Sequence, residues 1–162
     1  MLHVSEKAAT HWSHTSHYSE ISCIEIDGRR IVVKQIMPWY LRNLEGDERD
    51  RTILRINDMT EHYRSLLRRH QVPLSPEYQC LEENGIAVHV SSDMGESLDA
   101  MLRRAQAYDE CVHLIERVLV ALESLLTQAG ELDVGIDAQL SNFCPDNRRG
   151  SVYVDTFPPL CK

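Results

Sequence analysis

Hydrophobic and polar positions alternate over part of the first forty residues, and the spacing then changes to steps of three and four. Residues 18–26 and 30–36 are rich in β-branched side chains and flank Asp27-Gly28, a pair typical of a tight β-hairpin. Residues 46–70 predict one amphipathic helix instead, which the turn containing Pro73 and Pro76 should stop. Its apolar stripe consists of Ile53, Ile56, Met59, Tyr63, Leu66 and Leu67.

The second half of the chain repeats these two kinds of pattern. Short strands are predicted near residues 77–81 and 86–90, and a short helix should begin at Leu98 with Ser97 as its N-cap. Residues 108–128 predict a core helix, whose stripe contains Val112, Ile115, Leu119, Leu122 and Leu126. A hairpin should follow, with strands at 142–144 and 151–154 around a polar turn. Strands, helix, strands, helices and hairpin in this order predict an α+β fold.

Composition and charge narrow the functional classes. The chain has 162 residues, of which 43% are hydrophobic, enough for one domain or for two small lobes that share a core. Its formal net charge of −8 and its pI near 5.4 argue against nucleic acid or an anionic membrane as the main partner. A cationic substrate, such as an amino sugar or a basic peptide, would suit this charge, although most acidic surfaces serve solubility alone.

The cysteines and histidines carry no metal or disulfide signature. The five cysteines are widely spaced and form no Cys-x-x-Cys pair, as expected of reduced thiols in a cytosolic protein. His11, His14 and His17 lack a completing Cys or carboxylate, so a metal site there is disfavoured. Because no signal peptide and no membrane-length apolar run are found, a soluble cytoplasmic protein is expected.

The strongest chemical pattern lies near the end of the chain. Asp137 is followed five residues later by Asn142, and Asp155 comes after the predicted hairpin. Phosphoryl transfer needs an acid to accept the acceptor's proton, together with an amide oxygen and a second acid to hold Mg²⁺. The hairpin should bring Asn142 and Asp155 beside each other, where both can bind one ion.

Each of these residues also has an ordinary structural interpretation. Asp137 could cap a turn, Asn142 could satisfy loop backbone, and Lys34 at the end of 30–36 could be a solvated strand-end lysine. Asp155 is different, because it emerges from the apolar strand at 151–154. A carboxylate there is costly unless it meets a cation or hydrogen-bond donors. Asp155 is therefore the best-supported site residue.

With these residues in this order, the chain resembles a compact, divergent member of the protein-kinase-like superfamily, nearest the aminoglycoside and small-molecule phosphotransferases. The resemblance covers most of residues 18–159 and implies a two-lobed fold with a small antiparallel sheet lobe and a reduced helical lobe. Residues 1–17 would be a polar N-terminal segment, 18–95 the small lobe and 96–162 the helical lobe. Lys34 resembles the strand lysine that contacts nucleotide phosphates, and Glu61 its ion-pair partner, with Glu48 and Asp58 as alternatives.

The resemblance further implies ATP and Mg²⁺ as cofactors. Asp137 would be the catalytic acid, and Asn142 and Asp155 the metal ligands. The adenine would contact the hinge backbone that begins at His89, Val90 and Ser91. The acceptor would be a hydroxyl of a small molecule.

Several departures from the family pattern favour a second interpretation. No Gly-x-Gly-x-x-Gly motif precedes the first strand pair, Val134-Gly-Ile136 replaces the expected His or Arg before Asp137, and Gln139 stands where a lysine is usual. Asp155-Thr-Phe157 replaces Asp-Phe-Gly, and an activation segment and acceptor-binding helices are expected to be missing after it. A kinase-like pseudoenzyme that binds nucleotide or a protein is therefore the alternative, and a small α+β adaptor with chance matches is a third. The apolar helix 108–128 would be left partly uncovered, which predicts a homodimer or a protein partner.

Overall fold

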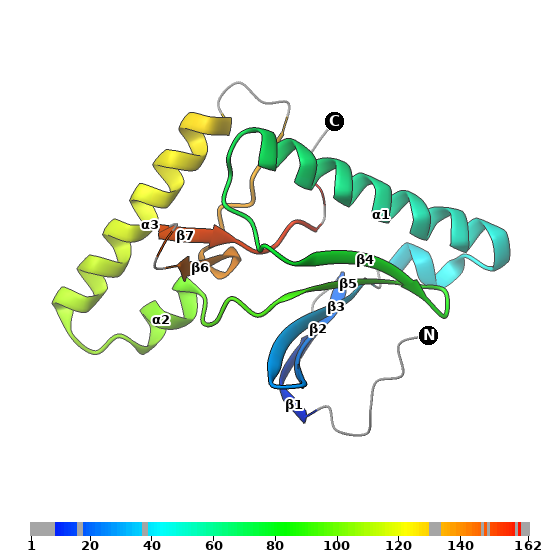
Figure 1. The fold of residues 1–162 in the computed structure, drawn as a ribbon, viewed down its shortest axis with the longest axis horizontal. Coiled ribbons are helices and arrows are strands. Elements are labelled where there is room, and N and C mark those ends of the chain that lie inside the picture. Colours follow the sequence, from blue (N-terminus) through cyan, green and yellow to red (C-terminus); the bar gives the residue numbers. More distant parts are fainter. Residues whose placement is uncertain are drawn as a thin grey trace. The chain divides into compact units, whose positions relative to one another are not determined.

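The computed structural model describes residues 9–15, 18–36, 39–129, 134–146, 148, 150–157 and 159 (Figure 1). The chain divides into two compact units. The first consists of Met1–Met59 and Pro76–Asp93, and the second of Thr60–Ser75 and Met94–Lys162. The mixture of an antiparallel sheet with helices confirms the α+β class that the sequence predicts.

The first unit contains a five-stranded antiparallel sheet with strand order β1-β2-β3-β5-β4. Hairpins join β2 to β3 and β4 to β5, so that β5 lies inside the sheet between β3 and β4 (Figure 1). The bounds of its strands are β1 Ala9–Thr15, β2 Ser19–Ile26, β3 Arg29–Ile36, β4 Tyr78–Glu83 and β5 Ile86–Ser92.

The first hairpin turns at Asp27-Gly28, as the sequence predicts, and the second turns at Asn84-Gly85. Asp27 and Gly28 have φ of 51° and 74°, and Asn84 and Gly85 have φ of 52° and 70°. Positive φ at both central residues is typical of the type I′ turn, whose twist matches that of the flanking strands. The predicted strands on either side are confirmed within two residues at each end.

Strand β1 is not among the strands that the sequence predicts. It pairs with β2 from Ala9↔Glu25 to Thr15↔Glu20, with a shift of register between Thr10 and Trp12. The segment is polar and lacks a clear alternation of hydrophobic and polar residues. Backbone pairing along one side can hold an edge strand, so its sequence does not need such a pattern. Local pattern therefore carried no signal for it.

Helix α1 spans Gly46–Arg69, in agreement with the helix predicted for residues 46–70, and its residues belong to both units. Ile53, Ile56, Tyr63 and Leu67 of the predicted stripe are buried, but Met59 is exposed, which corrects the stripe at that position. A short 3-10 helix, η1 Trp39–Asn43, precedes α1.

The second unit joins α2 Leu98–Arg104 and α3 Tyr108–Ala129 to a small hairpin. The hydroxyl of Ser97 accepts a hydrogen bond from the Ala100 amide at 3.3 Å, which confirms the predicted N-cap of α2. The hairpin follows a 3-10 turn and consists of two short antiparallel strands. Their bounds are η2 Leu140–Asn142, β6 Phe143–Asp146 and β7 Gly150–Tyr153.

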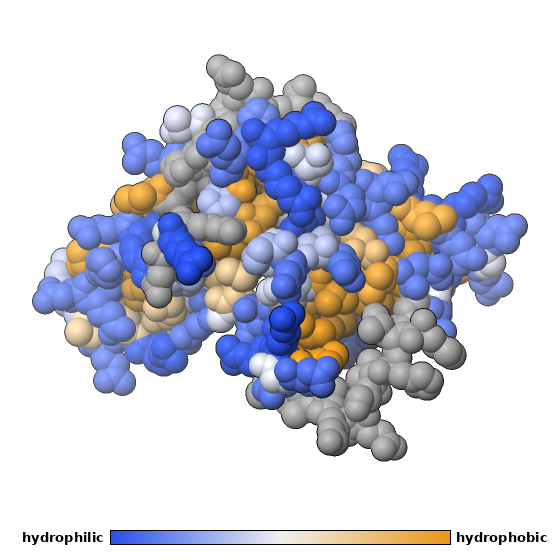
Figure 2. Space-filling model, in the orientation of Figure 1, coloured by the Kyte–Doolittle hydropathy of each residue, from blue (hydrophilic) through white to orange (hydrophobic). Residues whose placement is uncertain are grey.

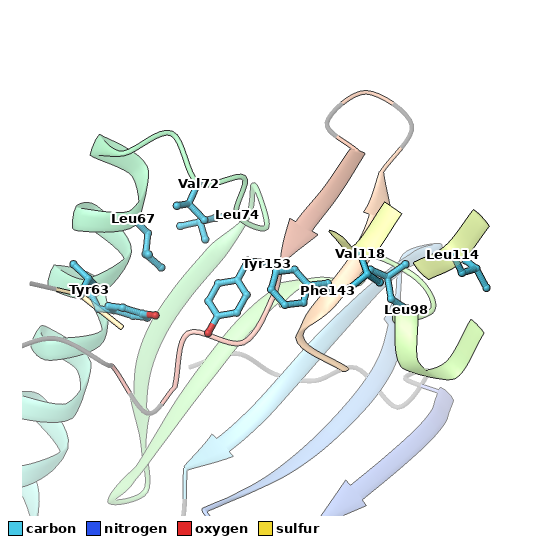
Figure 3. Close-up of a cluster of buried hydrophobic side chains, with 10 residues drawn as sticks. Tyr63, Leu67, Val72, Leu74, Leu98, Leu114, Val118, Phe143 and Tyr153 are labelled. Atoms are coloured by element: carbon cyan, nitrogen blue, oxygen red, sulfur yellow. The ribbon is translucent and has the colours of Figure 1, made fainter. Parts of the chain in front are cut away.

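The hydrophobic core of the second unit is built from the end of α1, the segment after it, α2, α3 and the hairpin (Figure 3). Figure 3 shows the rings of Phe143 and Tyr153 side by side between these elements, with centroids 5.4 Å apart. The buried members are Tyr63, Leu67, Val72, Leu74, Leu98, Leu114, Val118, Val134, Phe143 and Tyr153.

Helix α3 turns a different face to this core than the sequence predicts. Leu114 and Val118 are buried, whereas Ile115 and Leu119 of the predicted core stripe are exposed. The stripe is wrong at these two positions, whereas Leu122 is half-buried and packs against the core. The helix has apolar residues around more than half of its circumference, so spacing alone cannot choose the buried face. Hydrophobic side chains are accordingly visible on the surface in the region of α3 (Figure 2). Within the described residues, no helix is both long enough and apolar enough to cross a bilayer.

Candidate active site

The hairpin β6–β7 holds together the two halves of the predicted site in the second unit. Its register pairs Phe143 with Tyr153, and the Val154 amide donates to the Asn142 carbonyl at 2.9 Å. Asn142 therefore lies opposite the residue that precedes Asp155. The prediction that the hairpin brings these two residues near each other is thus supported by the backbone pairing.

Asp137 lies in the loop that leads to this hairpin and is half-buried. Its carboxylate accepts from Gln139 at both oxygens, from the backbone amide to Oδ1 at 3.2 Å and from the side-chain amide to Oδ2 at 3.3 Å. Its own amide donates to the Tyr153 hydroxyl at 3.3 Å. Asp137 thus does cap a local turn, as its structural interpretation expected, but its position is also set from outside the loop.

Asn142 links the loop to the hairpin. It is buried, and its side-chain Nδ2 donates to the Asp137 carbonyl at 3.3 Å. The Asn142 amide donates to the Gln139 carbonyl at 2.9 Å, which closes the turn of η2. Because Nδ2 is oriented toward the loop backbone, the Oδ1 acceptor of the same amide is directed away from that bond. The hydroxyl of Ser141 donates to this Oδ1, with Oγ and Oδ1 3.5 Å apart.

Asp155 follows the buried residues Val152 and Tyr153 and is half-buried itself. Its Oδ1 accepts from the Phe157 amide at 3.1 Å, so the carboxylate folds back over the start of the next segment. The expectation that Asp155 emerges from a buried strand is confirmed, and a backbone donor offsets part of the cost of burying its charge.

The segment after Asp155 is anchored to α1 by a buried arginine. Arg64 is fully buried, its Nη1 donates to Thr156 Oγ1 at 3.3 Å, and its Nη2 donates to the Ser75 carbonyl at 3.0 Å. The guanidinium thus fixes the residue next to Asp155 at a position that sequence spacing could not reveal.

The donor set of Asn142 and Asp155 fits Mg²⁺ in its chemistry. Both residues offer oxygen atoms, and Mg²⁺ is commonly held by one or two protein groups while substrate phosphates and water complete its octahedron. The described residues contain no group of three or more His, Cys, Asp or Glu side chains that could hold a metal without such help.

Lys34 and Glu61 lie on separate elements. Lys34 is half-buried in β3, where its backbone is in register with Ile21 on β2 and with His89 on β5. Glu61 is exposed on α1, as are the alternative partners Glu48 and Asp58. Lys34 belongs to the first unit and Glu61 to the second, and their pairing stays a prediction.

His89, Val90 and Ser91 lie in β5, inside the sheet. Their backbone is in register with β3 on one side and with β4 on the other. The side chain of His89 is buried between Tyr78, whose hydroxyl lies 2.8 Å from Nδ1, and Asn57, whose Oδ1 lies 3.2 Å from Nε2. Backbone contact of these residues with adenine stays a prediction, and it would have to compete with the sheet ladder.

Three residues that contact the candidate site are not among those that the sequence singles out for chemistry. Tyr63 and Tyr153 contact the backbone on either side of Ile136, and Arg64 holds Thr156. Tyr63 and Tyr153 stand within apolar patterns, where a tyrosine is read as core, and only the need of a buried hydroxyl for a partner could have drawn attention to them.

Comparison with known proteins finds similarity to solved structures but not to protein families or curated sequences. No protein-family model matches the chain, and no curated protein matches it either. Among solved structures, the crystal structure of the Mycobacterium tuberculosis PknI kinase domain is similar, with a TM-score of 0.51 at 16% sequence identity. The match covers 91% of this chain but 58% of that domain, so the chain spans little more than half of the structure that it resembles.

At this level of identity the likeness concerns the fold. The chain has a protein-kinase-like fold of reduced size.

Proposed function

We propose that the protein is an ATP- and Mg²⁺-dependent phosphotransferase that acts on a hydroxyl of a small molecule. The observation that carries this proposal is the connection of Asp137, Asn142 and Asp155. Asn142 donates to the Asp137 carbonyl at 3.3 Å and pairs through its own carbonyl with the residue before Asp155. A proton-accepting carboxylate and two oxygen ligands are thereby held by one small piece of backbone.

The proposed chemistry depends on positioning and charge. Asp137 would accept the proton of the acceptor hydroxyl, and Asn142 and Asp155 would hold Mg²⁺ through oxygen atoms. Bound Mg²⁺ would offset the charge that develops on the β- and γ-phosphates. Lys34 would neutralise the α- and β-phosphate oxygens, with Glu61 orienting its ammonium group.

The substrate side of the proposal rests on charge and on the family resemblance. With a net charge of −8, the protein suits a cationic acceptor such as an amino sugar, which is the acceptor class of the aminoglycoside phosphotransferases that the sequence resembles. The adenine of ATP would lie against the hinge that begins at His89, Val90 and Ser91. We further propose a cytoplasmic protein that acts as a homodimer or with a protein partner, because α3 exposes apolar side chains.

A kinase-like pseudoenzyme that binds nucleotide or protein without transfer is the alternative, and two observations favour it. Both carboxylate oxygens of Asp137 accept from Gln139, so both are already engaged within the loop and not by an acceptor hydroxyl. The sequence also has no glycine before Gly28, so the connection from β1 to β2 lacks the residues that usually bring backbone amides over phosphates.

The first test separates metal binding from turnover with three Asp→Asn variants. Asp155→Asn should abolish the Mg²⁺-dependent part of ATP binding in calorimetry, because it replaces a charged metal ligand by a neutral one. Asp137→Asn should leave ATP affinity within about twofold but lower phosphate transfer by about a hundredfold or more. Transfer would be followed as ADP release with a panel of amino sugars and basic peptides as acceptors.

Asp109→Asn on the first turn of α3 is the matched control, since Asp109 is exposed and belongs to a different element. It should change neither binding nor transfer. ATP binding without transfer in the wild type would favour the pseudoenzyme. Equal Mg²⁺-dependent affinity of the wild type and Asp155→Asn would contradict the metal assignment.

A further inference from the structure

Two buried tyrosines contact the backbone around Asp137. Tyr63 on α1 donates its hydroxyl proton to the Gly135 carbonyl at 2.7 Å, although the two residues are 72 positions apart in the sequence. The hydroxyl of Tyr153 on β7 accepts from the Asp137 amide at 3.3 Å. In Figure 3, the hydroxyls of Tyr63 and Tyr153 point toward the same space.

The two hydrogen bonds hold the backbone on either side of Ile136. Tyr63 gives its hydroxyl proton to the Gly135 carbonyl, and the Tyr153 hydroxyl oxygen accepts the Asp137 amide proton. One tyrosine therefore acts as donor and the other as acceptor for the same short segment of backbone.

Burial fixes the two tyrosines in place. The side chains of Tyr63 and Tyr153 are 0% and 2% exposed, and their rings belong to the hydrophobic core of the second unit. Burial, followed by the neighbouring Tyr63 hydroxyl, raises the pKa of Tyr153, which keeps its donor proton in place at any pH at which the protein would work. Because water has little access to the hydroxyls, breaking one bond leaves a buried polar group without a replacement partner.

The loop itself offers no side chain for this task. Val134, Gly135 and Ile136 have no polar side-chain atoms, and they stand where the family pattern places a His or an Arg. The backbone of this segment is held instead from α1 and from β7. Tyr63 and Glu61 lie two positions apart on α1, but Tyr63 is buried in the core and Glu61 is exposed, so it is the tyrosine that contacts the backbone before Asp137.

We propose that Tyr63 and Tyr153 are positioning residues that fix the backbone of residues 135–137 and thereby orient the Asp137 carboxylate. The proposal rests on the proposed function for what Asp137 does, but the fixing of the backbone can be tested separately. Neither tyrosine touches the reacting groups in this role. Each acts through Asp137.

The experiment removes one hydroxyl at a time and keeps the ring. Tyr153→Phe and Tyr63→Phe should each raise the hydrogen-exchange rate of the Asp137 amide about tenfold, measured by NMR in the full chain. With ATP and an accepted acceptor, kcat should fall about tenfold or more while KM for ATP stays within about twofold. The double variant should be no worse than about twofold beyond the stronger single variant, because both changes loosen the same three residues, 135–137.

Tyr78→Phe is the matched control, since it removes a hydroxyl that is hydrogen-bonded to His89 in the first unit. It should leave Asp137 amide exchange unchanged. Unchanged exchange in both Tyr63→Phe and Tyr153→Phe would overturn the proposal. Faster exchange with full kcat would overturn the positioning role.

The test also distinguishes failure of the proposed function. If the wild type transfers no phosphate, the exchange rates still decide whether the tyrosines hold residues 135–137. Faster exchange in the variants would then support the fixing of this backbone independently of catalysis. If one variant does not fold, the other still removes a hydrogen bond to residues 135–137, and its Asp137 amide exchange tests the proposal.

Discussion

At the scale of single residues, Asp137 is constrained at every polar atom. Its amide is held by Tyr153, its carbonyl by Asn142, and its carboxylate by Gln139. Fixed geometry of this kind favours catalysis when one carboxylate oxygen can leave Gln139 and face an acceptor hydroxyl, and it favours a binding role when both oxygens stay on Gln139. The residue that decides between enzyme and pseudoenzyme is therefore Gln139 as much as Asp137.

Thr156 provides a residue-scale prediction about the segment that carries Asp155. Thr156→Val keeps the shape of the side chain but removes the acceptor of the Arg64 Nη1 proton. Since Arg64 is fully buried, loss of this hydrogen bond should lower the free energy of unfolding by about 1–3 kcal/mol. Urea denaturation followed by circular dichroism would measure the change.

Thr52→Val on α1 is the control for this prediction. The Thr52 hydroxyl donates to the Glu48 carbonyl in an exposed hydrogen bond, so water can replace it. Its loss should alter stability by no more than about 0.5 kcal/mol. Equal effects of the two substitutions would show that the buried bond to Arg64 contributes nothing special.

At the scale of elements, α1 ends by a mechanism that the sequence signals did not indicate. The Val72 amide donates to the Leu67 carbonyl and the Gln71 amide to the Arg68 carbonyl, both at 3.0 Å, with Gln71 at a φ of 59°. This is the Schellman arrangement, in which glycine is the usual residue at the left-handed position. The helix therefore stops before Pro73, and the prolines follow an end that is already made.

Because Gln71 lies in the left-handed region, Gln71→Gly should stabilise the protein. A side chain with a Cβ costs about 1–2 kcal/mol there, and the greater entropy of glycine in the unfolded chain offsets part of the gain. We expect a net increase of roughly 0.5–1 kcal/mol in the free energy of unfolding. Thermal and urea denaturation would measure it.

Arg68→Gly gives the opposite sign three positions earlier. Arg68 is exposed and lies within α1, where glycine costs about 1 kcal/mol relative to a good helix former. Stabilisation by both substitutions, or by neither, would contradict the assignment of Gln71 to the left-handed cap.

The elements that sequence predicted well are those with local causes. The hairpin at Asp27-Gly28 and the N-cap at Ser97 depend on a few neighbouring residues, and both are confirmed. Strand β1 depends on pairing with β2, and the buried face of α3 depends on what packs against it, so neither could be read from its own pattern. The candidate site divides in the same way. The spacing of Asp137 and Asn142 is local, whereas the contact of Tyr63 with Gly135 joins positions 72 residues apart.

At the scale of the whole molecule, the surface of α3 is the feature that an isolated chain explains least well. Tyr108, Ile115 and Leu119 are 82%, 47% and 60% exposed, and their spacing places them along one stripe of the helix. An apolar stripe on a protein of net charge −8 is a stronger sign of association than single exposed apolar residues would be.

We therefore expect the protein to associate through this stripe, as a homodimer or with a protein partner. Leu119→Lys should shift a homodimer toward the 18.6 kDa monomer, because it places a charge in the apolar contact, while the free energy of unfolding of the monomer should change by no more than about 0.5 kcal/mol. His113→Lys puts the same charge on the exposed side of α3 away from the stripe and should leave association unchanged. Light scattering over a range of concentrations would decide. A wild-type protein that is monomeric throughout would contradict the homodimer, and the same stripe would then have to be tested against a protein partner by comparing capture with the wild type and with Leu119→Lys.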